Sequence, residues 1–206
     1  GKEAGASVNH PHSQILATSI IPPDVMRSLN GCRIYAEKHK KCVHCETLEW
    51  ELKQKERIIY QNSEFAALCP YVSHFNFEIR IFPLKHKKNF EFITEKEIAA
   101  LSDIFKQVFG KIRDKLQNPA YNFFIHTAPI NYLYDYHWHI EILPRISVWG
   151  GFELGTGIEV VVVSPEKATE ILKSSSKAFS ICFLYLLELI FFFPYTEISC
   201  NSKKVC

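Results

Sequence analysis

The most regular pattern of apolar residues in the chain lies between residues 98 and 116. Apolar side chains recur there every three or four positions, at Ile98, Leu101, Ile104, Phe105, Val108, Ile112 and Leu116. This spacing places them on one face of a helix. Thr94, followed three residues later by Glu97, is the signature of a capping box and predicts where the helix begins. Asn118-Pro119 predicts where it stops.

Alternation of apolar and polar residues predicts strands around this helix. In the clearest case, residues 75–82, Phe75, Phe77, Ile79 and Ile81 alternate with other residues, as in a half-buried strand. Further strands are expected at residues 58–60, 65–69, 121–126, 137–144 and 158–163. Helices are expected from Asp24 to about Lys41 and from Pro165 to Lys173, and the glycine-rich residues 150–157 are expected to form a flexible loop. The pattern predicts an α+β fold, an antiparallel sheet with helices packed on one face.

The last part of the chain departs from this pattern. Residues 178–193 form an apolar run interrupted by Ser180 and Glu188, which is shorter than the ~20 residues that a membrane span needs. A core or interface helix, a weak membrane anchor and a translated junction foreign to the fold remain open. We therefore treat residues 174–206 as an atypical tail without assigned function.

Composition and charge exclude some classes of partner. The net charge of +2 in 206 residues is small and the lysines are scattered, so a nucleic-acid partner is not expected. Seven unevenly spaced cysteines and the lack of a secretory signal at the start predict a cytoplasmic protein with reduced thiols. No membrane partner is expected.

Two short histidine motifs repeat along the chain. Residues 10–17 read HPHSQILA and residues 137–144 read HWHIEILP. In an extended segment alternate side chains share a face, so His10, His12 and Gln14 are expected to project together. The parallel texts indicate an internal repeat.

Cys42 and Cys45 form a CxxC pair. This spacing lets two thiolates occupy adjacent corners of a tetrahedron, although a redox pair and two incidental thiols are the alternatives. His86 and His137 lie at the ends of expected strands that can converge on the pair. Together they predict a closed, structural zinc site, in which His44, between the two cysteines, is expected to face outward.

His12 has the surroundings of a nucleophile. A neutral histidine with an aimed lone pair can attack phosphorus, and the Gln14 amide can donate to a phosphate oxygen. Gly5, Ala6 and Ser7 are small residues whose backbone N–H groups can approach a phosphate. The alternative is that His10 and His12 are merely buried and hydrogen-bonded.

Six motifs occur in one order: GASxxHPHSQI, CxxC, PxxH, HTAP, HWxxxIxP and GGFExGTG. Over about residues 1–173 the chain thereby resembles the galactose-1-phosphate uridylyltransferase family and its close relative ADP-glucose phosphorylase, in the histidine triad superfamily. Members have two repeated halves. The resemblance implies that residues 1–23 end the first half, that residues 24–173 form the second, and that the chain is a fragment of a longer protein.

The resemblance implies a ping-pong nucleotidyl transfer between a nucleotide sugar and a hexose 1-phosphate, with His12 as the covalent nucleophile. Uridylyl transfer is favoured over adenylyl transfer because it is commoner in the family. Gln14 would bind the transferred phosphoryl group, Phe152 and Glu153 would contact the sugar phosphate, and the full-length protein would be a homodimer.

The resemblance also implies zinc at Cys42, Cys45, His86 and His137, and a second, incomplete zinc site at His10. His126 and His139 would be pocket or outer-shell residues. In some members a carboxylate joins three histidines around iron, but Ser28 stands near that place here, so iron is not expected. The rival hypotheses are a histidine triad hydrolase and a non-catalytic, zinc-stapled binding module.

Overall fold

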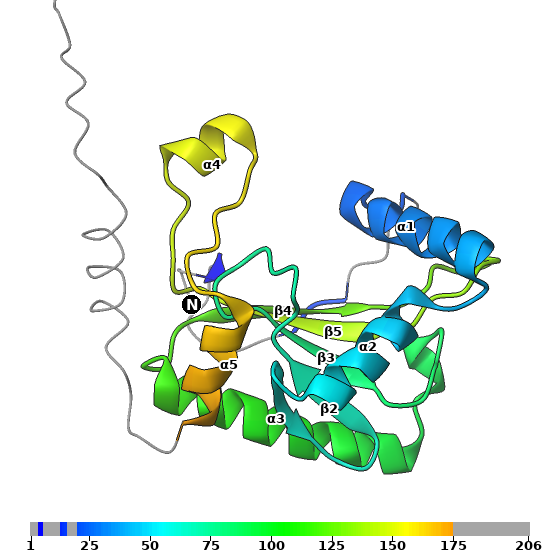
Figure 1. The fold of residues 1–206 in the computed structure, drawn as a ribbon, viewed down its shortest axis with the longest axis horizontal. Helices are drawn as coiled ribbons and strands as arrows, with labels where there is room; N and C mark the ends of the chain where they lie inside the picture. Colours follow the sequence, from blue (N-terminus) through cyan, green and yellow to red (C-terminus); the bar gives the residue numbers. More distant parts are fainter. Residues whose placement is uncertain (1–3, 6–12, 16–19, 175–206) are drawn as a thin grey trace, which may run out of the picture.

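The computed structural model describes residues 4–5, 13–15 and 20–174. Five antiparallel strands form one sheet in the order β1-β2-β3-β5-β4, with helices on both faces (Figure 1). The strands are β1 (Ile58–Gln61), β2 (Phe65–Leu68), β3 (Ile79–Pro83), β4 (Tyr121–His126) and β5 (His139–Pro144). The helices are α1 (Pro23–His39), α2 (Val43–Gln54), η2 (Phe90–Phe92), α3 (Glu95–Lys115), α4 (Gly151–Thr156) and α5 (Pro165–Lys173). The α+β class is confirmed.

Helix α3 begins where the sequence predicts it. The Thr94 side chain accepts a hydrogen bond from the Glu97 backbone N–H, and the Glu97 side chain accepts one from the Thr94 backbone N–H. Together these two bonds form a complete capping box. The buried stripe of α3 consists of Leu101, Ile104, Val108 and Ile112. Each fully buried side chain of this kind contributes about 1.5–3 kcal/mol relative to exposure. Ile98, expected on the same stripe, is 47% exposed instead.

The two faces of the sheet carry different layers. Along β2, Phe65 and Ala67 join the core cluster that contains the buried residues of α3 and α5. Ala66 and Leu68, which alternate with them, pack instead with Leu48 of α2. Helices α3 and α5 share one face, as expected. Helix α2 lies on the other face, where its Leu48 packs on Ala66 and Leu68.

The strand expected at residues 75–82 begins only at Ile79. Phe77 has a left-handed backbone (φ +60°), and the Glu78 N–H donates to the Phe75 carbonyl at 3.2 Å, so residues 75–78 form a turn. Phe77 is nevertheless 1% exposed, so its side chain is in the core although its backbone is not in the sheet. The prediction of a strand over the whole segment was therefore wrong.

Helix α2 was not predicted from the sequence: Cys42 is its N-cap and Cys45 lies in its first turn. Two other local expectations were wrong. The expected loop at residues 150–157 contains the short helix α4, whose Glu153 side chain accepts a hydrogen bond from the Gly150 N–H. Residues 158–163 are not a strand, because the backbone N–H groups of Val162 and Val163 bond to a side chain and not to a neighbouring strand.

Within the described residues, no helix is both long and apolar enough to cross a bilayer. Of the atypical tail, residues 175–206 lie outside the described part of the chain.

Candidate functional site

Four predicted metal ligands meet on one side of the sheet. Cys42, Cys45, His86 and His137 each offer a ligand atom, and these atoms all lie within 4.8 Å of one another. Cys45 Sγ is 3.1 Å from His86 Nδ1 and 3.4 Å from His137 Nδ1. Three separate segments of the chain therefore converge at this point.

The secondary structure explains how these ligands come together. Because Cys42 caps α2 and Cys45 follows in its first turn, both thiols lie at the start of that helix. His86 follows the end of β3, and His137 lies two residues before β5 begins. Strands β3 and β5 are antiparallel neighbours, so the end of one and the start of the other lie at the same edge of the sheet.

The distances in this cluster suit a tetrahedral metal ion. With a metal–sulfur bond near 2.3 Å and a metal–nitrogen bond near 2.0–2.1 Å, a tetrahedral angle puts sulfur and nitrogen about 3.6 Å apart. The separations of 3.1 and 3.4 Å between Cys45 Sγ and the two Nδ1 atoms are close to this value. Two thiolates and two imidazoles would leave no ligand position for water, which is typical of a structural site.

The buried side chains of this cluster favour their neutral forms. Burial and the neighbouring Cys42 raise the pKa of the Cys45 thiol to about 12. Burial and the nearby His86 and His44 lower the pKa of His137 to about 3, so its imidazole is neutral. A bound divalent cation would stabilise the thiolate form of the cysteines, and neutral imidazole is the form of histidine that binds metal.

Asp135 is a neighbour of this cluster that the sequence analysis did not identify. Its Oδ1 lies 3.4 Å from His86 Nε2, the ring nitrogen that faces away from the thiols. Carboxylates often hold the second nitrogen of a metal-binding histidine and so fix its orientation. The available signal was an acidic residue two positions before His137.

A second polar cluster lies on the same face of the sheet. His126 Nε2 donates to Glu141 Oε2 at 3.0 Å, and the His126 and His139 rings stack at 4.9 Å. Arg80 Nη2 forms ion pairs with Glu141 Oε1 at 2.7 Å and with Glu78 Oε1 at 2.8 Å. Burial alone would raise the pKa of Glu141, but the hydrogen bond from His126 and the charge of Arg80 lower it to about 2.

This second cluster differs from the first in carrying its own cation. The ligand atoms of His126, His139 and Glu141 are close enough to hold a metal ion, but the Arg80 guanidinium already pairs with Glu141. Arg80 was not predicted from the sequence, where its signal was a basic residue within a strand pattern. Ser28, where the resemblance implies a carboxylate in some members, lies in α1 and is uncharged.

His44 was expected to face outward, and this was wrong. Its Nε2 is 3.4 Å from Cys32 Sγ, and its ring contacts the rings of Tyr136 and His139, with centroids 5.6 and 5.1 Å away. Burial and the charge of Arg80 lower its pKa to about 4. His44 turns inward because it lies in the first turn of α2, on the side that faces the sheet.

The predicted catalytic motif is mostly outside the described residues. His10, His12, Ala6 and Ser7 all lie there. Gly5 is described and has φ +79°, a conformation that glycine tolerates best. Gln14 is described and exposed.

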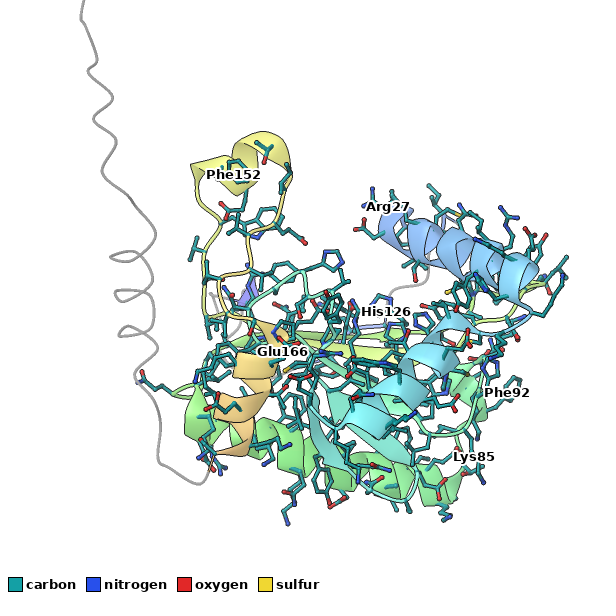
Figure 2. All side chains as sticks on the ribbon, viewed as in Figure 1. Arg27, Lys85, Phe92, His126, Phe152 and Glu166 are labelled. Atoms are coloured by element: carbon teal, nitrogen blue, oxygen red, sulfur yellow. The ribbon has the colours of Figure 1, made fainter. Side chains whose placement is uncertain are left out.

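Phe152 and Glu153 lie apart from the metal-ligand cluster. Both belong to α4, which stands away from the sheet at the end of a protruding segment, as the position of Phe152 in Figure 2 shows. Phe152 is 55% exposed. His126, by contrast, is the last residue of the edge strand β4 and lies well away from Phe152 in the same view.

Comparisons with known proteins agree with this architecture. Residues 29–149 match the model of the galactose-1-phosphate uridyl transferase C-terminal domain. The ADP-glucose phosphorylase of Arabidopsis thaliana is 35% identical over 180 residues, which are 85% of this chain and 50% of that protein. The galactose-1-phosphate uridylyltransferase of Thermotoga maritima is 31% identical over 186 residues, 85% of this chain and 58% of that protein. The chain thus spans about half the length of these curated relatives.

Solved structures give the same result. A crystal structure of Arabidopsis thaliana ADP-glucose phosphorylase with bound ADP-glucose has a TM-score of 0.76 and 34% identity, and the match covers 85% of this chain and 57% of that one. A uridylyltransferase structure has a TM-score of 0.76 and 29% identity over 84% of this chain and 57% of that one. Because the domain model matches more than half of the chain, this protein belongs to the galactose-1-phosphate uridyl transferase family, in the region of its C-terminal domain.

Proposed function

We propose that the full-length protein is a nucleotidyltransferase that exchanges a nucleoside monophosphate between a nucleotide sugar and a hexose 1-phosphate. The observation that carries this proposal is the similarity, over 85% of the chain, to a phosphorylase solved with bound ADP-glucose. The HPHSQ motif at residues 10–14 supplies the nucleophile that such a transfer needs.

In the proposed reaction, a ring nitrogen of His12 attacks the α-phosphorus of the nucleotide sugar. A nitrogen–phosphorus bond forms, the bond from that phosphorus to the bridging oxygen breaks, and the sugar 1-phosphate leaves with the electron pair. A phosphate oxygen of the second hexose 1-phosphate then attacks the same phosphorus and releases His12. Gln14 donates a hydrogen bond to a phosphoryl oxygen, and the backbone N–H groups of Gly5, Ala6 and Ser7 approach the phosphate. Phe152 and Glu153 contact the sugar phosphate.

The proposed role of the metal is structural. Cys42, Cys45, His86 and His137 would hold zinc, which would fasten the start of α2 to the edge formed by β3 and β5. His10 would be one ligand of a second zinc site, whose other ligands lie outside this chain. We assign no metal to His126 and His139, which we place in the pocket as outer-shell residues, because Arg80 already supplies the positive charge beside Glu141.

The covalent intermediate can be tested directly in the full-length protein. Incubation with a nucleotide sugar labelled in its α-phosphate should give a protein adduct that is labile in acid and stable in base. The adduct should be lost in His12→Asn and kept in His39→Gln, a change at an exposed histidine. An adduct that survives His12→Asn would remove His12 from its proposed role.

The nucleotide and the hexose require a substrate panel. Uridylyl transfer is the commoner reaction in the family, whereas the 35% identity to ADP-glucose phosphorylase favours adenylyl transfer as the second candidate. UDP- and ADP-sugars should therefore be tested against the 1-phosphates of galactose, glucose and mannose. Release of nucleoside monophosphate without a new nucleotide sugar would indicate a hydrolase, and failure to bind any of these substrates would favour a binding module.

Two further properties belong to this proposal. We expect a homodimer, which sedimentation of the full-length protein can test. We also expect a cytoplasmic location, because none of the four described cysteines, Cys32, Cys42, Cys45 and Cys69, forms a disulfide.

A further inference from the structure

Residues 147–163 form a protruding arm. The arm leaves the sheet after β5, carries α4 at its far end and returns just before α5 (Figure 1). Helix α4 has no buried residue, so its own packing does little to fix the arm in place. The orientation of α4 therefore depends on contacts at the base of the arm.

Asn76 bonds to both ends of the arm. Its Oδ1 accepts hydrogen bonds from the backbone N–H groups of Val162 at 3.0 Å and Val163 at 3.1 Å. Its Nδ2 donates to Ser147 Oγ at 3.4 Å. Asn76 is only 3% exposed, so water cannot readily replace these bonds. One side-chain amide thus ties the outgoing and the returning segment together.

The two residues before Asn76 also contact the arm, one on each of its two segments. His74 Nδ1 lies 2.6 Å from Glu159 Oε2 on the returning segment. The Phe75 ring lies nearly parallel to the Trp149 ring on the outgoing segment, at 8° and with centroids 6.3 Å apart. Residues 74–76, called here the anchor segment, therefore contact both sides of the arm through side chains of three different kinds.

The anchor segment is itself held firmly by the core. The Glu78 carboxylate accepts a hydrogen bond from the His74 backbone N–H at 2.6 Å and pairs with Arg80. Phe77 keeps its left-handed backbone while its side chain is 1% exposed in the main core. A bulky residue keeps such a conformation only where its surroundings fix it. The turn that presents residues 74–76 to the arm is consequently rigid.

Residues of the anchor segment and Glu153, which is proposed to contact the substrate, line the same pocket. Glu153, on α4, lines the same pocket as His74, Asn76, Trp149 and Glu159. A displacement of the base of the arm would therefore move Glu153, and with it Phe152, relative to the sheet.

We propose that His74, Phe75 and Asn76 are positioning residues that fix the arm and so set where Phe152 and Glu153 meet the hexose 1-phosphate. The anchoring itself follows from the contacts above. Only its effect on substrate rests on the proposed function.

Hydrogen–deuterium exchange on the full-length protein tests the anchoring without any assay of activity. In Asn76→Ala the amides of Val162 and Val163 lose their acceptor, and they should exchange about tenfold faster or more. Ser147→Ala and Phe75→Leu should loosen the outgoing segment and leave the Val162 and Val163 amides protected.

Asn62→Ala is the matched control. The Asn62 side-chain oxygen accepts from the backbone N–H groups of Glu64 and Phe65 at 3.1 and 3.0 Å, so it also bridges two amides, but in the turn between β1 and β2. Its loss should leave exchange in residues 147–163 unchanged. Equal exchange of the arm in wild type and folded Asn76→Ala, or equal loosening by Asn62→Ala, would overturn the proposed anchoring.

Steady-state kinetics test the second part. In an active enzyme, Phe75→Leu and Ser147→Ala should raise KM for hexose 1-phosphate severalfold and change kcat less, because the arm would be misplaced but its residues intact. A loosened arm with unchanged KM and kcat would overturn the role in substrate positioning. If the wild-type protein transfers no nucleotide, the proposed function fails while the exchange experiment still decides the anchoring.

Discussion

Cys45 Sγ lies 3.4 Å from His137 Nδ1, although 92 residues separate them in the sequence. The contact joins the first turn of α2 to the residue pair that precedes β5. The apolar cluster Leu48, Ile58, Ala66, Leu68 and Phe82 also packs α2 against this side of the sheet. A metal ion at this point would therefore act as a staple between helix and sheet.

Replacing Cys45 by Ser should remove this staple. We expect bound metal to fall from about one ion per chain to near zero and the melting temperature to drop, because metal binding to preformed ligands adds to folding free energy. Elemental analysis and thermal denaturation would measure both effects. His39→Gln, at an exposed histidine outside the cluster, should change neither, and a Cys45→Ser protein with full metal content would contradict the assignment.

Asp135→Asn should weaken metal binding without removing a ligand. The carboxylate lies 3.4 Å from His86 Nε2, and loss of such an outer partner typically costs about 10–100-fold in metal affinity. Competition with a chromophoric chelator would report the change. Asp114→Asn, an exposed aspartate on α3 that pairs with Arg113, is the matched control, and equal affinities in the two variants would exclude the role of Asp135.

Arg57→Met should destabilise the protein strongly. Arg57 pairs with Glu51 at 2.8 Å and with Glu166 at 2.6 Å, and both Arg57 and Glu51 are almost fully buried. Removing one partner of a buried ion pair leaves an uncompensated charge and typically costs about 3–5 kcal/mol.

Urea denaturation should show this loss as a lower midpoint. The double variant Arg57→Met, Glu51→Met should recover much of the stability, because it removes both buried charges. A double variant no more stable than Arg57→Met would instead point to lost packing of Arg57 against the Trp50 and Tyr71 rings, which lie 5.0 and 5.1 Å from its guanidinium carbon.

Glu97 should make stability depend on pH in acid. Burial would raise its pKa, but Lys87 and Thr94 lower it to about 2, below the ordinary value of 4.5. Because the folded state holds the proton less tightly than the unfolded state, the stabilisation is complete above pH 4.5 and is lost as the pH falls toward 2. Glu97→Gln should therefore be less stable than wild type at neutral pH, with the difference shrinking in acid. Urea denaturation between pH 7 and pH 3 measures this, and a constant difference would contradict it.

The sequence identified those elements whose signals are local. The capping box of Thr94 and Glu97 together with the spacing of Leu101 and Ile104 was enough for α3, because both signals depend on the geometry of a single helix. The CxxC spacing, His86 and His137 likewise indicated which side chains could bind one metal ion. Candidate metal ligands can be recognised in a sequence from the types of residue and from their spacing.

The errors arose where distant parts of the chain decide the local backbone. Residues 75–78 alternate like a strand, yet Phe77 enters the core from a turn. Residues 158–163 are apolar like a strand, but the N–H groups of Val162 and Val163 bond to the Asn76 side chain. Periodicity shows which residues can share a face and does not show whether a neighbouring strand exists.

By itself, the sequence determined the α+β class, the long capped helix and the set of candidate metal ligands, since these follow from short-range geometry and from the chemistry of side chains. Only the tertiary structure decided that His44 turns inward, that Arg80 supplies the cation beside Glu141, and that residues 74–76 hold an arm that starts more than 70 residues later. Those features depend on which side chains come into contact when the helices pack on the sheet. The spacing of residues in the sequence does not determine these long-range contacts.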